Sequence, residues 1–289
     1  MNNNIIPPSR FSYELSCTIK KTSIKTEEPT KNKEIIGSKT IISIFAKYGF
    51  LNLDLIRRTL KLKKHRINAN KTLKNMILEG IVDKYTIFYG NNHPNNDVYV
   101  LSTKGRSLLT TREMRHSIYR YDMSNIPYIL EKLAIAQWHI SVLEHSGIEV
   151  MYNHRVHYSN NIVIIPSLNI FRLSRIGHKI HIATVCAPQG IYKKDLGRFV
   201  TQVVKISQYL NQNRDRYRSF ILCVVCRSKN HLEDISNLLS KIRETRSIYI
   251  LYSIDTVTAD YALDPLAELF EVKNEKNTTQ TTIVSLRNK

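Results

Sequence analysis

The chain has 289 residues, of which 42% are hydrophobic and 9% aromatic, a composition that supports folded cores and excludes a wholly disordered protein. No apolar run approaches the roughly 18 residues that a membrane-spanning helix requires, and the Asn-rich start lacks the pattern of a secretory signal. We therefore expect a cytoplasmic protein without a membrane partner, with two compact domains and flexible ends.

Positive charge is concentrated in less than a third of the chain. The formal net charge is +19, and residues 37–120 contribute +11 of it, from 16 Lys/Arg against 5 Asp/Glu. Residues 1–36, 121–271 and 272–289 contribute only +2, +3 and +3. Because a phosphate-binding surface needs a local excess of cations, nucleic acid is the leading expected partner.

The first part of the chain, residues 1–36, is rich in Asn, Lys, Thr, Ser and Pro without sustained periodicity, and we expect a flexible basic tail. Its net charge of +2 favours a solvated tail over a dedicated DNA-binding arm. A helix is predicted next, from a cap at Ser38 to Tyr48. A second short helix is predicted from Asn52, its cap, to Leu60.

A turn over residues 61–66 leads to a third predicted helix, Ile67–Glu79. Two β-rich runs follow, Ile81–Tyr89 and Asp97–Leu101, on either side of a loop rich in Gly, Asn and Pro, and they predict a hairpin. Short helices followed by a hairpin are a specific order of elements. Residues 37–120 are therefore predicted to form a winged helix-turn-helix, with the hairpin as its wing.

Charge along the second and third predicted helices has one sign. From Leu55 to Leu78 there are eight Lys/Arg and no acid, whereas a solvated helix normally mixes signs. A merely basic solvated face is the alternative. Lysines and arginines neutralise phosphates, and asparagines can both donate to and accept from base edges. The expected DNA-binding residues are Arg57, Arg58, Lys61, Lys63, Lys64, Arg66, Asn68, Asn70, Lys71, Lys74 and Asn75, with Tyr89, Asn91, Asn92 and Asn96 on the wing.

Two further stretches resemble known proteins. Val98–Leu109 resembles the wing exit and following helix of many winged-helix proteins, and Leu133–Trp138 resembles the opening of the linking helix in the bacterial plasmid replication-relaxation family. The resemblance covers most of the chain from Gly37 to Ser253. It implies an accessory factor, associated with nucleoid or plasmid DNA, that recognises double-stranded DNA at a replication or transfer origin. Its implied protein partner is a replication initiator, a relaxase or another processing protein.

The second half of the chain alternates predicted helices and strands. Residues 121–271 are predicted to form an α/β domain, because such alternation implies a sheet covered by helices, and the whole chain is then of the α+β class. Residues 272–289 are expected to be a flexible tail, with an edge strand in Thr278–Val284 as the alternative. The predicted helices are Tyr128–His145, Lys193–Leu210 and Leu232–Ile242, and the predicted strands are Ile148–Tyr152, Ile162–Ile165, His178–Cys186, Phe220–Cys226 and Ser247–Tyr252.

The resemblance implies that this α/β domain is similar to PD-(D/E)XK nucleases, which hold a divalent metal with one acid after a proline and further acids on the next strand. In this chain Ser167 follows Pro166, and Thr184 and Cys186 stand at the later positions. We therefore expect an inactive, nuclease-like domain used for protein docking or for oligomerisation, such as a homodimer. No catalytic residue, metal or cofactor is expected.

Two other functions stay open. A metal-dependent nuclease would need displaced carboxylates such as Asp195 and Glu233. A winged-helix transcription regulator would use its second domain to sense a ligand or to dimerise. The C-x2-C spacing of Cys223 and Cys226 is interpreted as part of a buried strand, because residues three apart on a strand face opposite sides. Trp138 is expected in the core.

Overall fold

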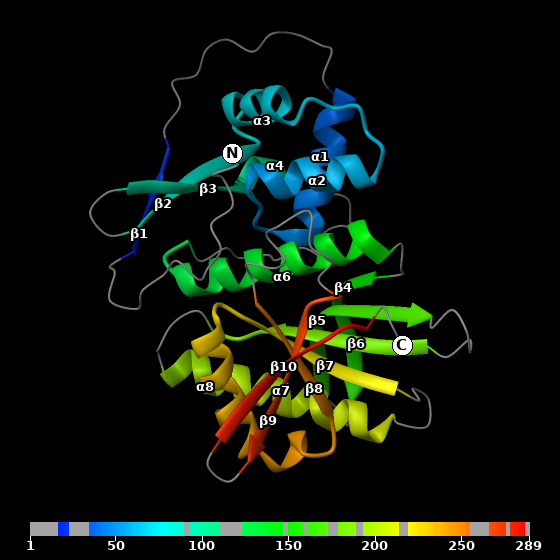
Figure 1. Cartoon of the computed structure of the whole chain (residues 1–289). Coiled ribbons are helices and arrows are strands. Elements are labelled where there is room, and N and C mark those ends of the chain that lie inside the picture. Colours follow the sequence, from blue (N-terminus) through cyan, green and yellow to red (C-terminus); the bar gives the residue numbers. More distant parts are fainter. Residues whose placement is uncertain are drawn as a thin grey trace. The chain divides into compact units, whose positions relative to one another are not determined.

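The computed structural model has helices and sheets in two units and belongs to the α+β class (Figure 1). Among the described residues, those up to Ala136 form the first unit and those from Gln137 onward form the second. The structure describes residues 17–22, 35–89, 93–109, 123–146, 150–158, 161–172, 179–188, 193–213, 219–254, 266–275 and 278–286.

The first unit contains the helices and the hairpin that the sequence predicts, in the predicted order. Its described elements before the last helix are β1 (Cys17–Lys21), α1 (Ile35–Tyr48), α2 (Leu53–Leu62), α3 (Ala69–Leu78), β2 (Val82–Tyr89), β3 (His93–Leu101) and α4 (Thr103–Ser107). β2 and β3 form an antiparallel pair. A bridge between Leu51 and Tyr99 connects the residues just before α2 to the hairpin.

Local sequence explains where the helices of this unit begin. Ser38 lies inside α1, which already begins at Ile35, so the predicted cap is wrong; the apolar pattern extends one turn further back than expected. Asn52 caps α2 as predicted, because its Oδ1 accepts a backbone N–H of the first turn at 2.8 Å. Asn68 caps α3 in the same way and accepts the Lys71 N–H at 3.1 Å.

A strand that the sequence does not predict extends the hairpin to three strands. β1 lies in the segment expected to be a flexible tail, and it pairs antiparallel with β2 so that Ile19 stands opposite Ile87. Ile19 is β-branched, half-buried and packed against the core of the hairpin. Lys21 forms an ion pair with Asp83 of β2 at 2.7 Å. The expectation of an unstructured tail is therefore wrong for these residues.

The residues that follow β3 pack closely against the residues that follow α3. Ser102 caps α4, because its Oγ accepts the Gly105 N–H at 3.0 Å, and the same hydroxyl donates to the Gly80 carbonyl at 2.5 Å. Gly80 follows α3 with a φ of +69°, a conformation that favours glycine. A Cβ at Gly105 would lie 2.1 Å from the carbonyl oxygen of Ile81, so only glycine fits there.

The core of the hairpin is completed by α6 (Ile126–Ser146), whose early residues belong to the first unit. Ile129, fully buried, clusters with Val98 of β3 and with the other apolar residues of the hairpin. The division between the units therefore falls inside this helix, after Ala136, whereas the sequence places it before residue 121.

A mixed sheet organises the second unit, and its described strands follow the order β10-β9-β8-β7-β6-β5-β4 (Figure 1). β4, β5 and β6 are antiparallel neighbours, β6, β7 and β8 are parallel, and β9 and β10 are antiparallel again. α7 and α8 supply the crossovers that the parallel strands need. The bounds are β4 (Val150–Tyr158), β5 (Asn161–Arg172), β6 (Lys179–Cys186), α7 (Lys193–Gln212), β7 (Ser219–Cys226), α8 (Lys229–Ser240), β8 (Tyr249–Ile254), β9 (Leu269–Glu275) and β10 (Thr278–Val284), with a short 3-10 turn, η2 (Arg243–Thr245).

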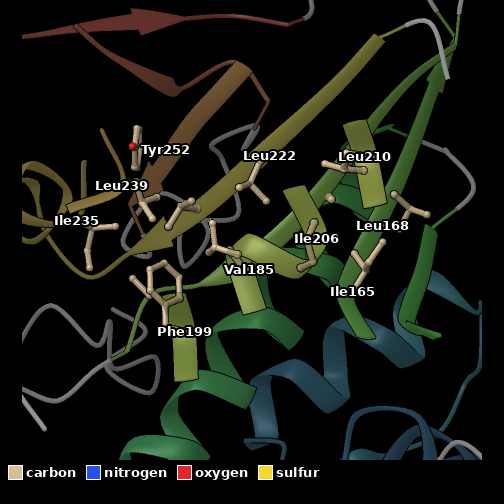
Figure 2. Close-up of a cluster of buried hydrophobic side chains, with 14 of the residues drawn as sticks. Ile165, Leu168, Val185, Phe199, Ile206, Leu210, Leu222, Ile235, Leu239 and Tyr252 are labelled. Carbon is tan, nitrogen blue, oxygen red and sulfur yellow. The ribbon is translucent and has the colours of Figure 1, made fainter. Parts of the chain in front are cut away.

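The hydrophobic core of the second unit lies between the sheet and the helices α7 and α8. Figure 2 shows Ile206 of α7 and Leu239 of α8 in one cluster with Val185 and Leu222 of the central strands. Burying each such side chain contributes about 1.5 to 3 kcal/mol relative to its exposure. Trp138 of α6 is also fully buried, as the sequence predicts.

The last two strands correct the expectation of a flexible tail from residue 272. β9 and β10 pair antiparallel, with Thr281 opposite Val272, so the edge strand considered as the alternative is the structure that forms. Its run of Thr, Ile and Val favours extended backbone, and β9 offers it an open edge.

None of the helices in the described ranges combines the length and the apolar character that are needed to cross a membrane. The longest of the helices given above, α6, has 21 residues and includes Glu131, Lys132 and Glu144.

Candidate nucleic-acid interface

Helices α2 and α3 have an apolar inner face and a polar outer face. The inner face of α2 includes Leu55, Ile56 and Leu60, and that of α3 includes Leu73 and Met76, each at most 3% exposed. Ile56 and Leu60 are four residues apart and Leu73 and Met76 three, so each pair lies on one face of its helix, toward the interior. Arg57, between Ile56 and Leu60 on α2, and Lys74, between Leu73 and Met76 on α3, face solvent.

Seven cations occupy the exposed positions of α2, α3 and the turn between these helices. We refer to them as the basic surface: Arg57, Lys61, Lys63, Lys64, Arg66, Lys71 and Lys74. No Asp or Glu occurs between Leu55 and Leu78, so the surface carries one sign. In the turn, Lys64 adopts a φ of 55° and its N–H donates to the Lys61 carbonyl at 2.9 Å. The cations of this tight turn therefore lie between those of α2 and those of α3.

Arg58 departs from the prediction that it contacts DNA. It is only 2% exposed, and it lies among the buried residues of α2 together with Leu55 and Thr59. A guanidinium in this position has no access to a phosphate of another molecule. The two arginines are adjacent in the sequence, and the apolar stripe of α2 is wide here. Periodicity alone therefore does not tell which of the two is buried. Arg58 is therefore excluded from the basic surface.

The three asparagines expected to read base edges differ in what their side chains do. Asn68 is exposed, but its oxygen caps α3. Asn75 is only partly exposed. Asn70 is exposed, and its Oδ1 accepts a hydrogen bond from Nη2 of Arg57 at 2.9 Å. The structure therefore brings together one predicted base reader and one predicted phosphate contact, from two different helices.

Two further groups carry charge near the basic surface or in the hairpin. Burial, and secondarily the charge of Lys63, lower the pKa of Lys47 on α1 to about 8. In the hairpin, the carboxylate of Asp97 is paired with Lys84 at 2.7 Å and accepts a hydrogen bond from Thr86 at 2.9 Å. The charge of Lys63 thus acts on Lys47, whereas the carboxylate of Asp97 is already paired within the hairpin.

The predicted contacts of the wing lie largely outside the described residues. Asn91 and Asn92 fall outside them entirely. Tyr89 ends β2, where its backbone pairs with His93, and Asn96 lies within β3, but the side chains of Tyr89 and Asn96 are outside the described part of the structure. The roles of these residues stay predictions.

Two residues that hold the C-terminal end of α3 are not predicted from the sequence. Nζ of Lys104 donates to the Glu79 carbonyl at 2.7 Å, which satisfies a carbonyl at the C-terminal end of the helix. Ser102 holds the neighbouring Gly80 carbonyl. The signal in the sequence is a serine followed by a short helix, which indicates a cap. Nothing local indicates that this cap meets the end of α3, 22 residues earlier.

In the second unit, the positions of the implied nuclease acids form a buried polar cluster. Ser167 of β5 stands opposite Thr184 of β6, and both are 0% exposed. The Ser167 hydroxyl donates to Oδ1 of Asn169 at 3.0 Å and lies 3.1 Å from Nδ1 of His139 on α6. Cys186, further along β6, is also buried. Within the ranges that the structure describes, no group of three His, Cys, Asp or Glu side chains could hold a metal ion.

The alternative carboxylates and the cysteine pair have separate surroundings. Asp195 lies in the first turn of α7, 3.6 Å from the guanidinium of Arg198, whereas Glu233 lies on α8. Cys223 and Cys226 are fully buried in β7, which confirms their interpretation as core residues. Burial raises the pKa of both thiols.

No protein-family model, curated protein or solved structure matches the chain. Function is therefore inferred from the chemistry and the placement of its own residues.

Proposed function

We propose that the first unit is a winged helix-turn-helix that binds double-stranded DNA, with α3 as the helix that enters the major groove and the β2–β3 hairpin as the wing. The observation that carries this proposal is the basic surface: seven exposed cations on two successive helices and their turn, without an acid between Leu55 and Leu78. A surface helix without such a partner gains stability by mixing charge signs, so a one-sign surface favours an anionic partner.

The placement of the cations supports a duplex as this partner. The major groove is about 12 Å wide and accepts an α-helix, and phosphates line both of its edges. Lys71 and Lys74 lie on α3, whereas Lys61 and Arg66 flank it from the end of α2 and the turn. In this arrangement the cations of the turn neutralise backbone phosphates, while the first turn of α3 approaches base edges.

For the whole chain, we propose an accessory role in the replication or transfer of a plasmid or another mobile element. This role rests on the resemblance of Val98–Leu109 and Leu133–Trp138 to the replication-relaxation family. The second unit then has a nuclease-like fold without its acids and docks a replication protein or a second copy. The hydroxyls of Ser167 and Thr184 support its inactivity, because a hydroxyl lacks the charge to hold Mg²⁺ against its hydration shell.

A matched charge-neutralisation experiment tests the DNA-binding surface. The first variant replaces Lys61, Lys63 and Lys64 with Gln, and the control replaces Lys229, Lys241 and Arg243, exposed cations of the second unit, with Gln. Both variants lose the same charge. At about 0.15 M salt we expect the first to bind a duplex roughly 100-fold more weakly, since each lost phosphate contact removes about 0.9 from the log–log salt slope. An equal loss in both variants, measured by fluorescence anisotropy, would show attraction by net charge alone.

Two further assays separate the roles of the whole chain. Footprinting across a plasmid tests the accessory role: protection confined to an origin supports it, and protection confined to a promoter identifies a transcription regulator. Incubation with supercoiled plasmid and Mg²⁺ or Mn²⁺ tests the second unit, for which we expect no nicking. Nicked product that disappears on Asp195→Ala or Glu233→Ala would overturn the inactive assignment and identify an enzyme.

A further inference from the structure

We infer that Arg57 and Asn70 form a single recognition element that selects guanine at the start of α3. The inference deepens the proposed DNA-binding function and rests on it. Its observation is the hydrogen bond from Nη2 of Arg57, on α2, to Oδ1 of Asn70, in the first turn of α3, at 2.9 Å. Both side chains are exposed, so the pair is available to a ligand.

The bond to Arg57 changes what Asn70 can recognise. A free asparagine suits adenine, because its amide oxygen accepts from the adenine N6 amine while its NH2 group donates to N7. A guanidinium has only donors, so the amide oxygen of Asn70 must face Arg57 and its Nδ2 must face elsewhere. A base amine brought to that oxygen would also meet the cation beside it. The pair therefore presents mainly donors, and the cation beside the amide oxygen disfavours a base amine there.

A group that mainly donates matches guanine best. In the major groove guanine offers two acceptors, N7 and O6, which the fork of an arginine contacts together. Adenine offers one acceptor beside a donor amine, cytosine offers a donor amine, and thymine offers one acceptor beside a methyl group. Arg57 uses one of its five N–H donors on Asn70 and keeps enough for a bidentate contact.

The surroundings of Arg57 support a base contact over a phosphate contact. Asn70 lies in the first turn of α3, and the N-terminal residues of a recognition helix are those that reach base edges. Arg57 also acts electrostatically on the hairpin: burial, and then the charge of Asp97, raise the pKa of Tyr99 on β3 to about 12, and the charge of Arg57 opposes this rise. The bond to Asn70 orients Arg57 before binding, which lowers the entropy cost of a directional contact.

Selection from a randomised duplex library tests the inference on the full-length protein. Wild type is compared with Arg57→Ala, Arg57→Lys and Asn70→Ala, and Lys74→Ala is the matched control because Lys74 is another exposed cation of the basic surface. We expect wild type to select guanine at one position where Arg57→Ala and Asn70→Ala both lower the discrimination of guanine from adenine, by roughly 5- to 100-fold. Arg57→Lys should not restore it, because lysine keeps the charge but lacks the fork.

The control and a modified base make the outcomes distinct. Lys74→Ala should weaken all duplexes alike and leave the base preference unchanged. Placing 7-deazaguanine at the selected position removes the N7 acceptor, and this should weaken wild type but not Arg57→Ala. Selection of adenine, equal weakening of all duplexes by the Arg57 and Asn70 variants, or binding without any base preference would each overturn the inference and leave duplex binding intact. A wild-type protein that binds no duplex would overturn the proposed function as well.

Discussion

Replacing Gly105 with alanine tests the contact that fixes α3 relative to the hairpin. The added Cβ would lie 2.1 Å from the carbonyl oxygen of Ile81 and 3.1 Å from its carbonyl carbon. Both are backbone atoms, so no side-chain rotation relieves the overlap. The same Ile81 oxygen accepts the Ser102 N–H at 3.0 Å, and moving it away breaks that bond too.

The expected loss of stability follows from these two effects. Overpacking a well-filled site costs about 1 to 3 kcal/mol, and a lost backbone hydrogen bond costs about 1 kcal/mol more. We therefore expect Gly105→Ala to lower the free energy of unfolding of the first unit by about 2 to 4 kcal/mol. For a unit of this size, this corresponds to a fall in melting temperature on the order of 10 °C.

Gly197 provides a matched control of opposite sign. It is exposed on α7, and a Cβ there would meet nothing within 4 Å, so Gly197→Ala should stabilise the second unit by about 0.5 to 1 kcal/mol through helix propensity. Thermal melting gives the size of each effect, and hydrogen exchange localises it. Faster exchange should appear in peptides from α3 and β3 for Gly105→Ala only. Wild-type stability and exchange in Gly105→Ala would refute the close approach.

Three other substitutions or treatments have defined outcomes. Asn68→Ala should cost about 1 kcal/mol of stability by removing the α3 cap, and Asn68→Ser should restore it in urea titrations. Burial, and then the charge of Arg227, lower the pKa of His231 to about 4. Between pH 6.5 and 4 the folded state therefore keeps His231 neutral, while the unfolded chain binds a proton there. The free energy of unfolding should fall by up to about 3 kcal/mol as the pH is lowered from 6.5 toward 4, and His231→Gln should flatten this pH dependence. Cys223 and Cys226 should resist iodoacetamide at pH 8 until the protein is unfolded, as read by mass spectrometry; rapid labelling of the native protein would contradict their burial.

The sequence predicts the parts of the fold that depend on local patterns. Apolar periodicity locates α2 and α3, and Asn52 marks the start of α2 because capping acts within one helical turn. It does not predict β1, since a strand of five residues is stabilised by a partner, β2, that lies more than 60 residues later. The sequence leaves β10 as an alternative only, for the same reason. Its pairing with β9, and not its composition alone, decides that it forms.

The candidate site is predicted in composition but not in contacts. A run of cations without acids is visible in the sequence, and the structure leaves seven of its eight Lys/Arg exposed. Burial of Arg58 beside exposed Arg57 depends on how α2 is rotated against the core, which periodicity gives only within about one residue. The bond between Arg57 and Asn70 joins residues 13 apart on two helices, so it requires their packing to be known.

The salt dependence of duplex binding tests the central claim most directly. Association of the full-length protein with a duplex of about 30 base pairs is measured between about 50 and 200 mM salt. If four to six cations of the basic surface neutralise phosphates, the slope of log K against log salt is roughly −4 to −5, and replacing Lys71 and Lys74 with Gln reduces its magnitude by about 0.9 for each lost contact. A slope near zero, or one that these two substitutions leave unchanged, would contradict DNA binding through this surface.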